Sequence, residues 1–329
     1  MRVLVTGGAG YIGSHAVKAL LAHGHAPVVL DNLCRGHRAA LPYGVPFFHA
    51  DLRDAHALGE LFAQEPIDCI MHFAGLTYVG ESVAQPLEYH DVNTVGSIRL
   101  LRAAADAGVK RFIFSSTCAT YGEPAVLPIT EETPQNPINP YGNSKLMTER
   151  VLADHAHADP AFAYAALRYF NVAGAAGDGS LGEHHEPETH LIPLLLQVAL
   201  GRRDAVTLFG EDYPTPDGTC VRDYVHVDDL VHAHLLAMNA LRDGDARRYN
   251  VAIGRGYSVR EVLDAARQVT GHPIPVRAGP RRPGDPATLF ADARRIRAEL
   301  GWEPRHTTLH SMIESAWRWF RDHPRGYAD

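Results

Sequence analysis

The chain has 329 residues, 46% of them hydrophobic and 21% charged, which is typical of a folded chain with one large domain or two smaller ones. Its net charge of -7 comes without any basic block, so nucleic acid is not an expected partner. No apolar run is long enough to span a bilayer, and the start of the chain leaves no room for a signal peptide, so we expect a cytoplasmic protein.

The first predicted elements are a strand, a glycine-rich loop and a helix. Residues 3–6 form a short apolar run, glycines follow at 7, 10 and 13, and apolar residues then recur at helical spacing. In this order the glycines allow a tight turn and close approach of the backbone to a pyrophosphate, which would lie at the helix start. The dinucleotide-binding residues predicted here are Gly7, Gly10, Tyr11, Ile12 and Gly13.

A second predicted strand, at residues 28–30, ends in an acidic residue. Asp31 follows Gly13 by 18 residues, near the spacing expected for the carboxylate that binds the adenosine ribose. A carboxylate there favours NAD and repels the extra phosphate of NADP. Arg35 is a weaker signal in the opposite direction.

Strands and helices continue to alternate through the first half. Further strands are predicted at residues 45–49, 67–73, 110–114 and 163–168, with helices at 55–63 and 86–107 between them. This alternation predicts an α/β fold with a doubly wound parallel Rossmann sheet. Ligands bind at the carboxyl ends of such strands. The residues that fall at those ends are Gly7, Asp31, Asp51, Ala74 and Thr117.

A helix with a possible proton-transfer pair is predicted to begin near residue 140. Asn139 suits the N-cap and Pro140 the first helical position, while Tyr141 and Lys145 are one turn apart on the same face. A phenol titrates near pH 10, but a nearby ammonium and a helix start both stabilise the phenolate. We therefore expect the pKa of Tyr141 to be lowered toward neutrality, so that it can act as a base.

The second half has a different pattern, with a loop rich in glycine, histidine and acids at residues 174–188. A strand is expected at 206–209, loops at 212–219 and 280–285, and helices at 191–200, 227–241, 259–269, 292–300 and 309–320. The predicted division is an NAD-binding domain at 1–170 and a smaller mixed α/β lobe at 171–329, with some segments returning to the first domain.

Cysteine and histidine spacing does not predict a metal site. The four cysteines lack the spacing of a metal or disulfide framework and are expected to be reduced thiols. Histidine pairs such as His184/His185 and His232/His234 have no convincing third ligand nearby in sequence, so no metal is predicted.

The chain resembles the extended short-chain dehydrogenase/reductases and, within them, the UDP-glucose 4-epimerase family (also called the UDP-galactose 4-epimerase family). The resemblance extends over almost the whole chain. The matching parts of the chain are the pair Tyr141 and Lys145 and the segments 6–15, 30–33, 72–75, 79–83, 168–171, 201–203 and 221–227.

This resemblance implies reversible epimerisation at C4 of a UDP-hexose through a 4-keto sugar. The Tyr141 phenolate would take the proton of the sugar 4-hydroxyl, NAD would carry the hydride, and Thr117 would hydrogen-bond the reacting oxygen. The other cofactor-binding positions implied are Asp31, Asn32, Asp51, Leu52, Phe73, Ala74, Gly75, Asn93, Ser115, Lys145 and Phe170. The implied substrate-binding positions are Thr117, Asn171, Leu191, Phe209, Arg222, Arg282, Asp285 and Leu289.

Two positions depart from the family pattern. Thr77 replaces a lysine that reaches the cofactor in some members, and His190 replaces an asparagine near the nucleotide. Leu289 is intermediate in size at a position that influences acceptance of N-acetylated sugars, so the preference for these sugars stays open.

Two other functions compete with epimerisation. A nucleotide-sugar 4,6-dehydratase or decarboxylase would need acid–base groups after Thr117, where this chain has Cys118 and Ala119. A non-catalytic NAD-sensing regulator would not need the set Thr117, Tyr141 and Lys145.

The resemblance also implies a homodimer formed by the helices at 86–107 and from 140. A partly buried helix face is predicted at Leu146, Met147, Val151 and Leu152, although packing within one chain would need the same pattern.

Overall fold

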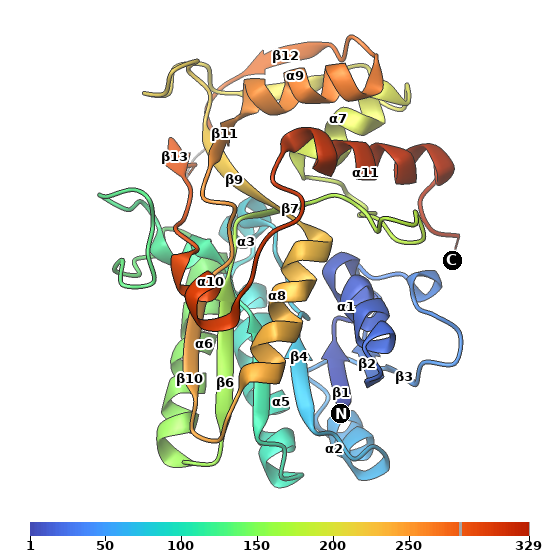
Figure 1. Cartoon of the computed structure of the whole chain (residues 1–329), viewed down its shortest axis with the longest axis vertical. Coiled ribbons are helices and arrows are strands. Elements are labelled where there is room, and N and C mark those ends of the chain that lie inside the picture. Colours follow the sequence, from blue (N-terminus) through green and yellow to red (C-terminus); the bar gives the residue numbers. More distant parts are fainter. Residues whose placement is uncertain (283–284, 329) are drawn as a thin grey trace.

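The computed structural model describes residues 1–282 and 285–328. Its largest layer is a parallel sheet with the strand order β10-β6-β5-β4-β1-β2-β3, in the lower part of Figure 1. This sheet confirms the predicted doubly wound α/β fold. The strands are β1 (Arg2–Thr6), β2 (Ala26–Asp31), β3 (Phe47–His49), β4 (Cys69–His72), β5 (Arg111–Ser115), β6 (Ala163–Arg168) and β10 (Ala246–Asn250).

Helices cover both faces of the sheet. One apolar core joins it to α1 (Tyr11–Ala22), α8 (Val227–Ala240) and α10 (Arg294–Leu300). A second core on the opposite face joins it to α2 (Ala55–Gln64), α5 (Gly96–Asp106) and α6 (Pro140–Ala158). All six residues of β6 are buried, as expected for a parallel strand that is covered on both faces. The carboxyl ends of the strands are left for ligand binding.

The helical periodicity at 86–107 corresponds to three consecutive segments after α3 (Val79–Ala84). These are α4 (Pro86–Tyr89), the π-helical η2 (His90–Val95) and α5. Single π-helical turns within α-helices are frequent at functional sites. Here the π-helical turn contains Asn93, one of the predicted cofactor residues.

A second lobe lies above the sheet in Figure 1. Its core packs α7 (Leu191–Ala199), α9 (Val259–Thr270) and α11 (Leu309–Asp322) together. One of its sheets joins β7 (Asn171–Ala173), β11 (Gly256–Ser258) and β13 (Thr288–Leu289) to β9 (Val221–His226), and another pairs β8 (Val206–Phe209) with β12 (Val276–Gly279). The expected helices and the strand 206–209 are confirmed, whereas the other short strands were not predicted. Two residues of the predicted loop 280–285, 283 and 284, lie outside the described residues.

Strand β10 is the main feature of the sheet that sequence patterning missed. It carries Arg247 and Arg248 in succession, and among the described residues it pairs with β6 alone, so its apolar pattern is weak. Both β10 and α8 follow residue 170 but belong to the sheet layer. The division of the chain at residue 170 stays a prediction.

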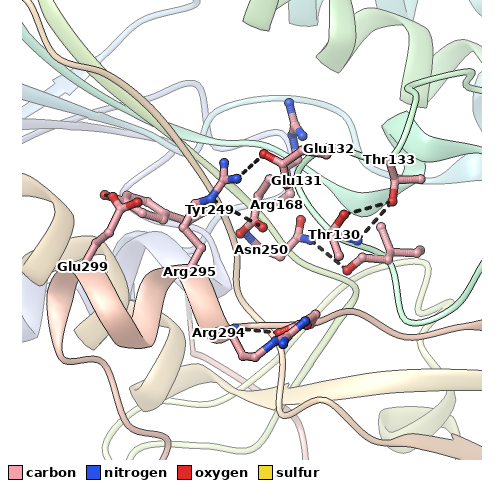
Figure 2. A network of polar contacts seen from close by, with 12 residues as sticks. Thr130, Glu131, Glu132, Thr133, Arg168, Tyr249, Asn250, Arg294, Arg295 and Glu299 are labelled. Carbon is pink, nitrogen blue, oxygen red and sulfur yellow. Dashed lines mark hydrogen bonds and ion pairs between the residues drawn. The ribbon is translucent and has the colours of Figure 1, made fainter.

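A polar network fastens this sheet edge to the segment that precedes α6 (Figure 2). The backbone N–H of Asn250 donates to Glu131 at 2.8 Å, and the Asn250 side chain donates to the carbonyl of Ile129 at 3.1 Å. Arg295 on α10 forms ion pairs with Glu131, at 3.8 Å, and with Glu132. The network therefore holds residues 129–132, which precede the helix of Tyr141 in sequence, against β10 and α10.

Candidate active site

The glycine loop between β1 and α1 has the shape that a dinucleotide needs. Gly7 has φ +69°, and a Cβ there would lie 2.5 Å from the backbone nitrogen of Ala74. A Cβ on Gly13 would lie 2.1 Å from the carbonyl oxygen of Gly7. Gly10 is the N-cap of α1 and no side chain caps it, so the first N–H groups of the helix are oriented toward an anion. These features fit a pyrophosphate group.

Two residues of this loop have side chains that point elsewhere. The Tyr11 hydroxyl donates to the carbonyl of Gly174 at 2.7 Å, and Ile12 packs partly against the core. Any contribution of these two residues to an anion site would therefore come from their backbone N–H groups.

Asp31 at the end of β2 is held in place by the backbone. Its carboxylate accepts from Ala9 N–H at 3.0 Å and from Leu33 N–H at 2.8 Å. Burial raises the pKa of Asp31, and these two hydrogen bonds act against the rise. Each carboxylate oxygen keeps acceptor capacity, so the side chain can still bind ribose hydroxyls.

A hydrogen bond links the ends of β2 and β3. Asn32 donates to Asp51 at 2.8 Å, and hydrogen bonding from Arg53 lowers the pKa of Asp51 to about 2. Leu52 is 5% exposed and belongs to the core on the α2 and α5 side. The structure thus groups Asp31, Asn32 and Asp51 at one edge of the sheet, where an adenosine would be expected.

The end of β4 approaches the Tyr141 helix through Asn93. The Asn93 side chain accepts from Leu76 N–H at 2.8 Å and donates to the Ser144 hydroxyl at 3.0 Å. A Cβ on Gly75 would lie 2.9 Å from Asn93 Oδ1 and 3.6 Å from Lys145 Nζ. Asn93 is therefore a positioning residue behind this segment. The preceding residues, Phe73 and Ala74, pack partly against the two cores of the sheet.

The predicted proton-transfer residues come together at the start of α6. Asn139 caps this helix by accepting from Gly142 N–H at 2.8 Å, as predicted. The hydroxyl of Thr117, which lies two residues after β5 and caps the short 3-10 helix at Cys118–Tyr121, interacts with the phenol of Tyr141. Lys145 is 3% exposed, and its ammonium donates to the carbonyl of Ser115 at 3.0 Å.

The predicted lowering of the Tyr141 pKa is wrong for the protein groups alone. Burial raises the pKa of Tyr141 to about 12, and the hydrogen bond with Thr117 only opposes that rise. Burial also lowers the pKa of Lys145 to about 8. The Lys145 ammonium lies over the Phe114 ring and bonds a carbonyl, so the protein leaves the phenol short of stabilising positive charge.

Four of the predicted substrate residues converge in the second lobe. Asp285 lies 3.5 Å from Arg222 and 2.9 Å from Arg282 in two ion pairs. The guanidinium of Arg282 also lies over the Phe209 ring, 5.1 Å from its centroid. Two arginines beside one carboxylate, with an exposed aromatic ring, fit an aromatic base joined to a diphosphate.

The remaining substrate residues surround this group. Leu289 pairs with Arg222 between β13 and β9, and Asn171 pairs with Tyr224 of β9. Leu289 and Phe170 share a small core cluster with Cys118, which directly follows Thr117. The cluster connects the proton-transfer residues to the arginines. Leu191 begins α7 and packs against the core of the second lobe.

Several residues that support the predicted ones were not predicted. Tyr169 shares a hydrogen bond with the hydroxyl of the predicted residue Ser115, and Ser116 and Arg168 both bond the carboxylate of Glu149 on α6. The Arg168–Glu149 pair is buried and joins β6 to α6. No local signal identifies these contacts, because each partner has an ordinary sequence context. Of the two departures, Thr77 is exposed, and His190 contacts Glu183 rather than capping α7.

The chain is similar to proteins of one enzyme family along its whole length. Residues 3–252 match the model of the NAD dependent epimerase/dehydratase family. The chain is 52% identical to the UDP-glucose 4-epimerase of Lacticaseibacillus casei, with 100% of this chain and 99% of the relative aligned.

Two solved structures are similar along the same length. The UDP-glucose 4-epimerase of Bifidobacterium longum, in complex with NAD+ and UDP, is 42% identical with a TM-score of 0.96 and covers 99% of this chain and 100% of its own. The UDP-Glc/GlcNAc 4-epimerase of Campylobacter jejuni is 43% identical with a TM-score of 0.84, over 98% of this chain and 99% of its own.

Proposed function

The chain belongs to the NAD dependent epimerase/dehydratase family, and from this premise we propose that it inverts C4 of a UDP-hexose. The protein is an isomerase that interconverts UDP-glucose and UDP-galactose, with NAD as its cofactor. The observation that supports this function best is that Thr117 interacts with Tyr141 one helical turn from a buried Lys145, in a chain where two arginines meet at Asp285.

In the proposed chemistry, the chain supplies proton transfer and orientation. NAD, when bound, accepts a hydride from sugar C4 and returns it, and its oxidised ring brings positive charge. Tyr141 takes the proton of the 4-hydroxyl at its phenol oxygen, while Thr117 hydrogen-bonds the same reacting oxygen. The high pKa of Tyr141 in the protein alone makes added positive charge necessary for phenolate formation.

Binding groups at both ends hold the reactants. The first turn of α1 receives the pyrophosphate of the cofactor, and the Asp31 carboxylate receives its adenosine ribose. Arg222 and Arg282 bind the UDP diphosphate. These roles leave the sugar between Tyr141 and Leu289, so that it can present either face of C4 to the cofactor.

Elimination chemistry, which other nucleotide-sugar enzymes of this fold perform, is not supported. A dehydratase needs a proton donor for the leaving hydroxyl close to Thr117. The next residue, Cys118, is fully buried, and burial raises the pKa of its thiol. Ala119 has no ionisable group. A purely NAD-sensing role would have no need for a phenol, Tyr141, that interacts with the Thr117 hydroxyl in a proton-transfer set.

Product analysis tests the proposal directly. The purified protein is incubated with UDP-galactose and, in parallel, with UDP-N-acetylglucosamine, and the nucleotide sugars are separated by chromatography. UDP-glucose is the product expected from the first substrate. A dehydrated 4-keto product, or no product at all, would contradict the function. The second incubation determines whether Leu289 leaves room for an N-acetyl group.

The assembly proposed is a homodimer that buries an exposed apolar surface on α3, α4, η2 and α6. Val83, Leu87, Val95 and Met147 are 62%, 83%, 36% and 47% exposed on these segments. Contiguous exposed apolar side chains are typical of an interface. Of the residues predicted for this face, Leu146 and Leu152 are instead buried within their own chain, and Val151 packs partly against the same sheet core.

Light scattering tests this assembly. We expect a particle of twice the 36.0 kDa chain mass at micromolar concentration. Leu87→Asp should shift the particle toward monomer, whereas the control Val126→Asp, at a 73% exposed residue elsewhere, should not. A monomeric wild-type protein would refute the dimer.

The proposed location is the cytoplasm. All four cysteines are free thiols in the structure, as expected in a reducing compartment. In the described part of the chain, no helix is long and apolar enough to cross a membrane.

A further inference from the structure

Four ligand-type side chains converge within the segment that leads into α7, next to the predicted substrate residue Leu191. Glu183, His185, Glu188 and His190 each offer one donor atom, and these four atoms lie within 4.8 Å of one another. The side chains of Glu183 and Glu188 are only 4% and 3% exposed. Two carboxylates that are largely removed from water require nearby positive charge.

The spacing of these atoms suits a small metal ion. His185 Nδ1 lies 3.4 Å from Glu183 Oε1 and 3.6 Å from Glu188 Oε2. This nitrogen is buried, and both distances are longer than a well-formed hydrogen bond. Donor atoms about 2.0–2.1 Å from a tetrahedral zinc ion are about 3.3 Å from one another, close to the observed separations. His190 Nδ1 contacts Glu183 Oε1 more closely, so an ion would separate that pair.

The surrounding contacts hold the donors in place. Glu188 Oε1 accepts from the N–H groups of Thr189, at 2.7 Å, and His190, at 2.8 Å, which leaves Oε2 facing His185. The Tyr78 hydroxyl donates to the carbonyl of Pro187 at 3.0 Å and ties the segment to the sheet domain. Outer hydrogen bonds of this kind orient the ligands of metal sites.

A second group of metal-type residues provides a contrast. His226, Asp228 and His306 also lie close together. However, His226 Nδ1 accepts from the Asp228 N–H at 3.1 Å, and His226 Nε2 bonds the Ser315 hydroxyl at 3.0 Å. Both ring nitrogens are therefore occupied, and this second group has no donor left from His226.

Protons are the alternative to a metal ion in the first group. Burial opposes charge on His185, yet Glu183 and Glu188 raise its pKa to about 10. Two imidazolium rings would balance the two carboxylates, and so would one divalent cation bound by two neutral imidazoles. The distances from His185 Nδ1 to the two carboxylates match the spacing between zinc ligands better than that of hydrogen bonds, which favours the cation.

We propose that Glu183, His185, Glu188 and His190 bind one divalent cation of the zinc class. Imidazole and carboxylate donors suit zinc, and four protein ligands make a closed site with a structural role. The ion would fix residues 183–190 and hence the start of α7, where Leu191 is expected to contact the nucleotide. Its four donors include none of the proposed proton-transfer residues, so metal content can be measured separately from epimerase activity.

Metal content and spectroscopy of the full chain test the site. The purified protein is stripped with a chelator, reloaded with zinc or cobalt, dialysed and analysed by elemental mass spectrometry. We expect about one zinc per chain and a visible cobalt spectrum typical of four-coordinate nitrogen and oxygen ligands. Zinc at about 100 times its Kd should raise Tm by about 4 °C for a chain of this length.

Matched variants separate this site from adventitious binding. His185→Asn and Glu188→Gln should lose the bound zinc and the rise in Tm. The control His184→Asn removes the adjacent imidazole, which is outside the cluster, and should keep both. Equal zinc retention by His185→Asn and wild type, or no retention by wild type, would overturn the proposal. If the variants fail to fold, an octahedral cobalt spectrum of the wild-type protein would overturn it as well.

Discussion

Tyr141→Phe is the substitution that separates chemistry from folding most cleanly. It removes only the phenol oxygen that is proposed to take the proton of the sugar 4-hydroxyl. General acid–base help contributes about 10² to 10⁴ in rate, so kcat should fall by that factor, equivalent to about 3 to 5 kcal/mol of transition-state stabilisation. The ammonium of Lys145 keeps its bond to the Ser115 carbonyl, so the surroundings should remain intact.

The effect on stability should be much smaller. The Tyr141 hydroxyl interacts with Thr117, and the Thr117 oxygen also accepts from Ala119 N–H at 3.1 Å. Losing one such hydrogen bond costs about 1 kcal/mol, or about 1 to 2 °C in Tm for a chain of this length. NAD content, measured as the nucleotide released on denaturation, should stay near that of the wild type.

Tyr89→Phe is the matched control. The Tyr89 ring lies 6.5 Å from that of Tyr141, but its hydroxyl contacts Glu81 Oε2 and the Tyr78 carbonyl, both at 2.8 Å. Removing it leaves buried groups unpaired and should cost about 1 to 3 kcal/mol of stability, with less than about a tenfold change in kcat. Both variants are assayed by conversion of UDP-galactose and by thermal unfolding. Near-normal turnover of Tyr141→Phe would refute its assignment as the base.

Three further outcomes are expected. Arg222→Ala should raise KM for UDP-galactose by about tenfold or more, with a smaller change in kcat, because a charge-assisted hydrogen bond contributes about 1.5 to 3 kcal/mol. An unchanged KM in steady-state assays would argue against the contact between Arg222 and the diphosphate. Because burial lowers the pKa of Lys145 to about 8, kcat should fall above that pH. Between about pH 8 and the ordinary pKa of 10.5, the unfolded chain binds more protons at Lys145 than the folded chain, so this residue makes the stability rise with pH. A Tm that is constant or rises over this range would therefore exclude unfolding as the cause of the lower kcat. A kcat that stays flat to about pH 10 would contradict the role of the Lys145 ammonium in catalysis. The purified wild-type protein should release NAD on denaturation. The Asp31→Asn variant should release less NAD and discriminate less against NADP. Recovery of NADP from the wild type would show that Arg35, and not Asp31, governs the site of the adenosine ribose.

Local sequence identified the parts of the site that lie within one strand, loop or helix. The spacing of Gly7, Gly10 and Gly13 after an apolar run, and of Asp31 after the next run, follows from requirements of a single β-α-β unit. The Asn139 cap and the pair Tyr141 and Lys145 depend on helix geometry over two turns. These features were readable because the interacting residues are close in sequence.

Contacts between distant segments were decided by tertiary structure. Strand β10 lies far from its partner β6 in sequence, as a parallel pair with its long crossover requires, and its own residues, with Arg247 and Arg248, carry little pattern. The pKa of Tyr141 likewise depends on how deeply folding buries the ring, and burial outweighs the local helix and lysine effects that its sequence context suggests.

The sequence alone therefore determined the fold class, and it predicted the glycine loop and the helix that carries Tyr141 and Lys145, because each depends on local backbone geometry and short-range periodicity. Only the tertiary structure decided that Arg222 and Arg282 meet at Asp285, that Phe170 and Leu289 adjoin Cys118, and that Glu183 and His185 face each other as donors. The physical reason is that these distances depend on the packing of two lobes and on the path of an irregular loop, neither of which has a sequence period.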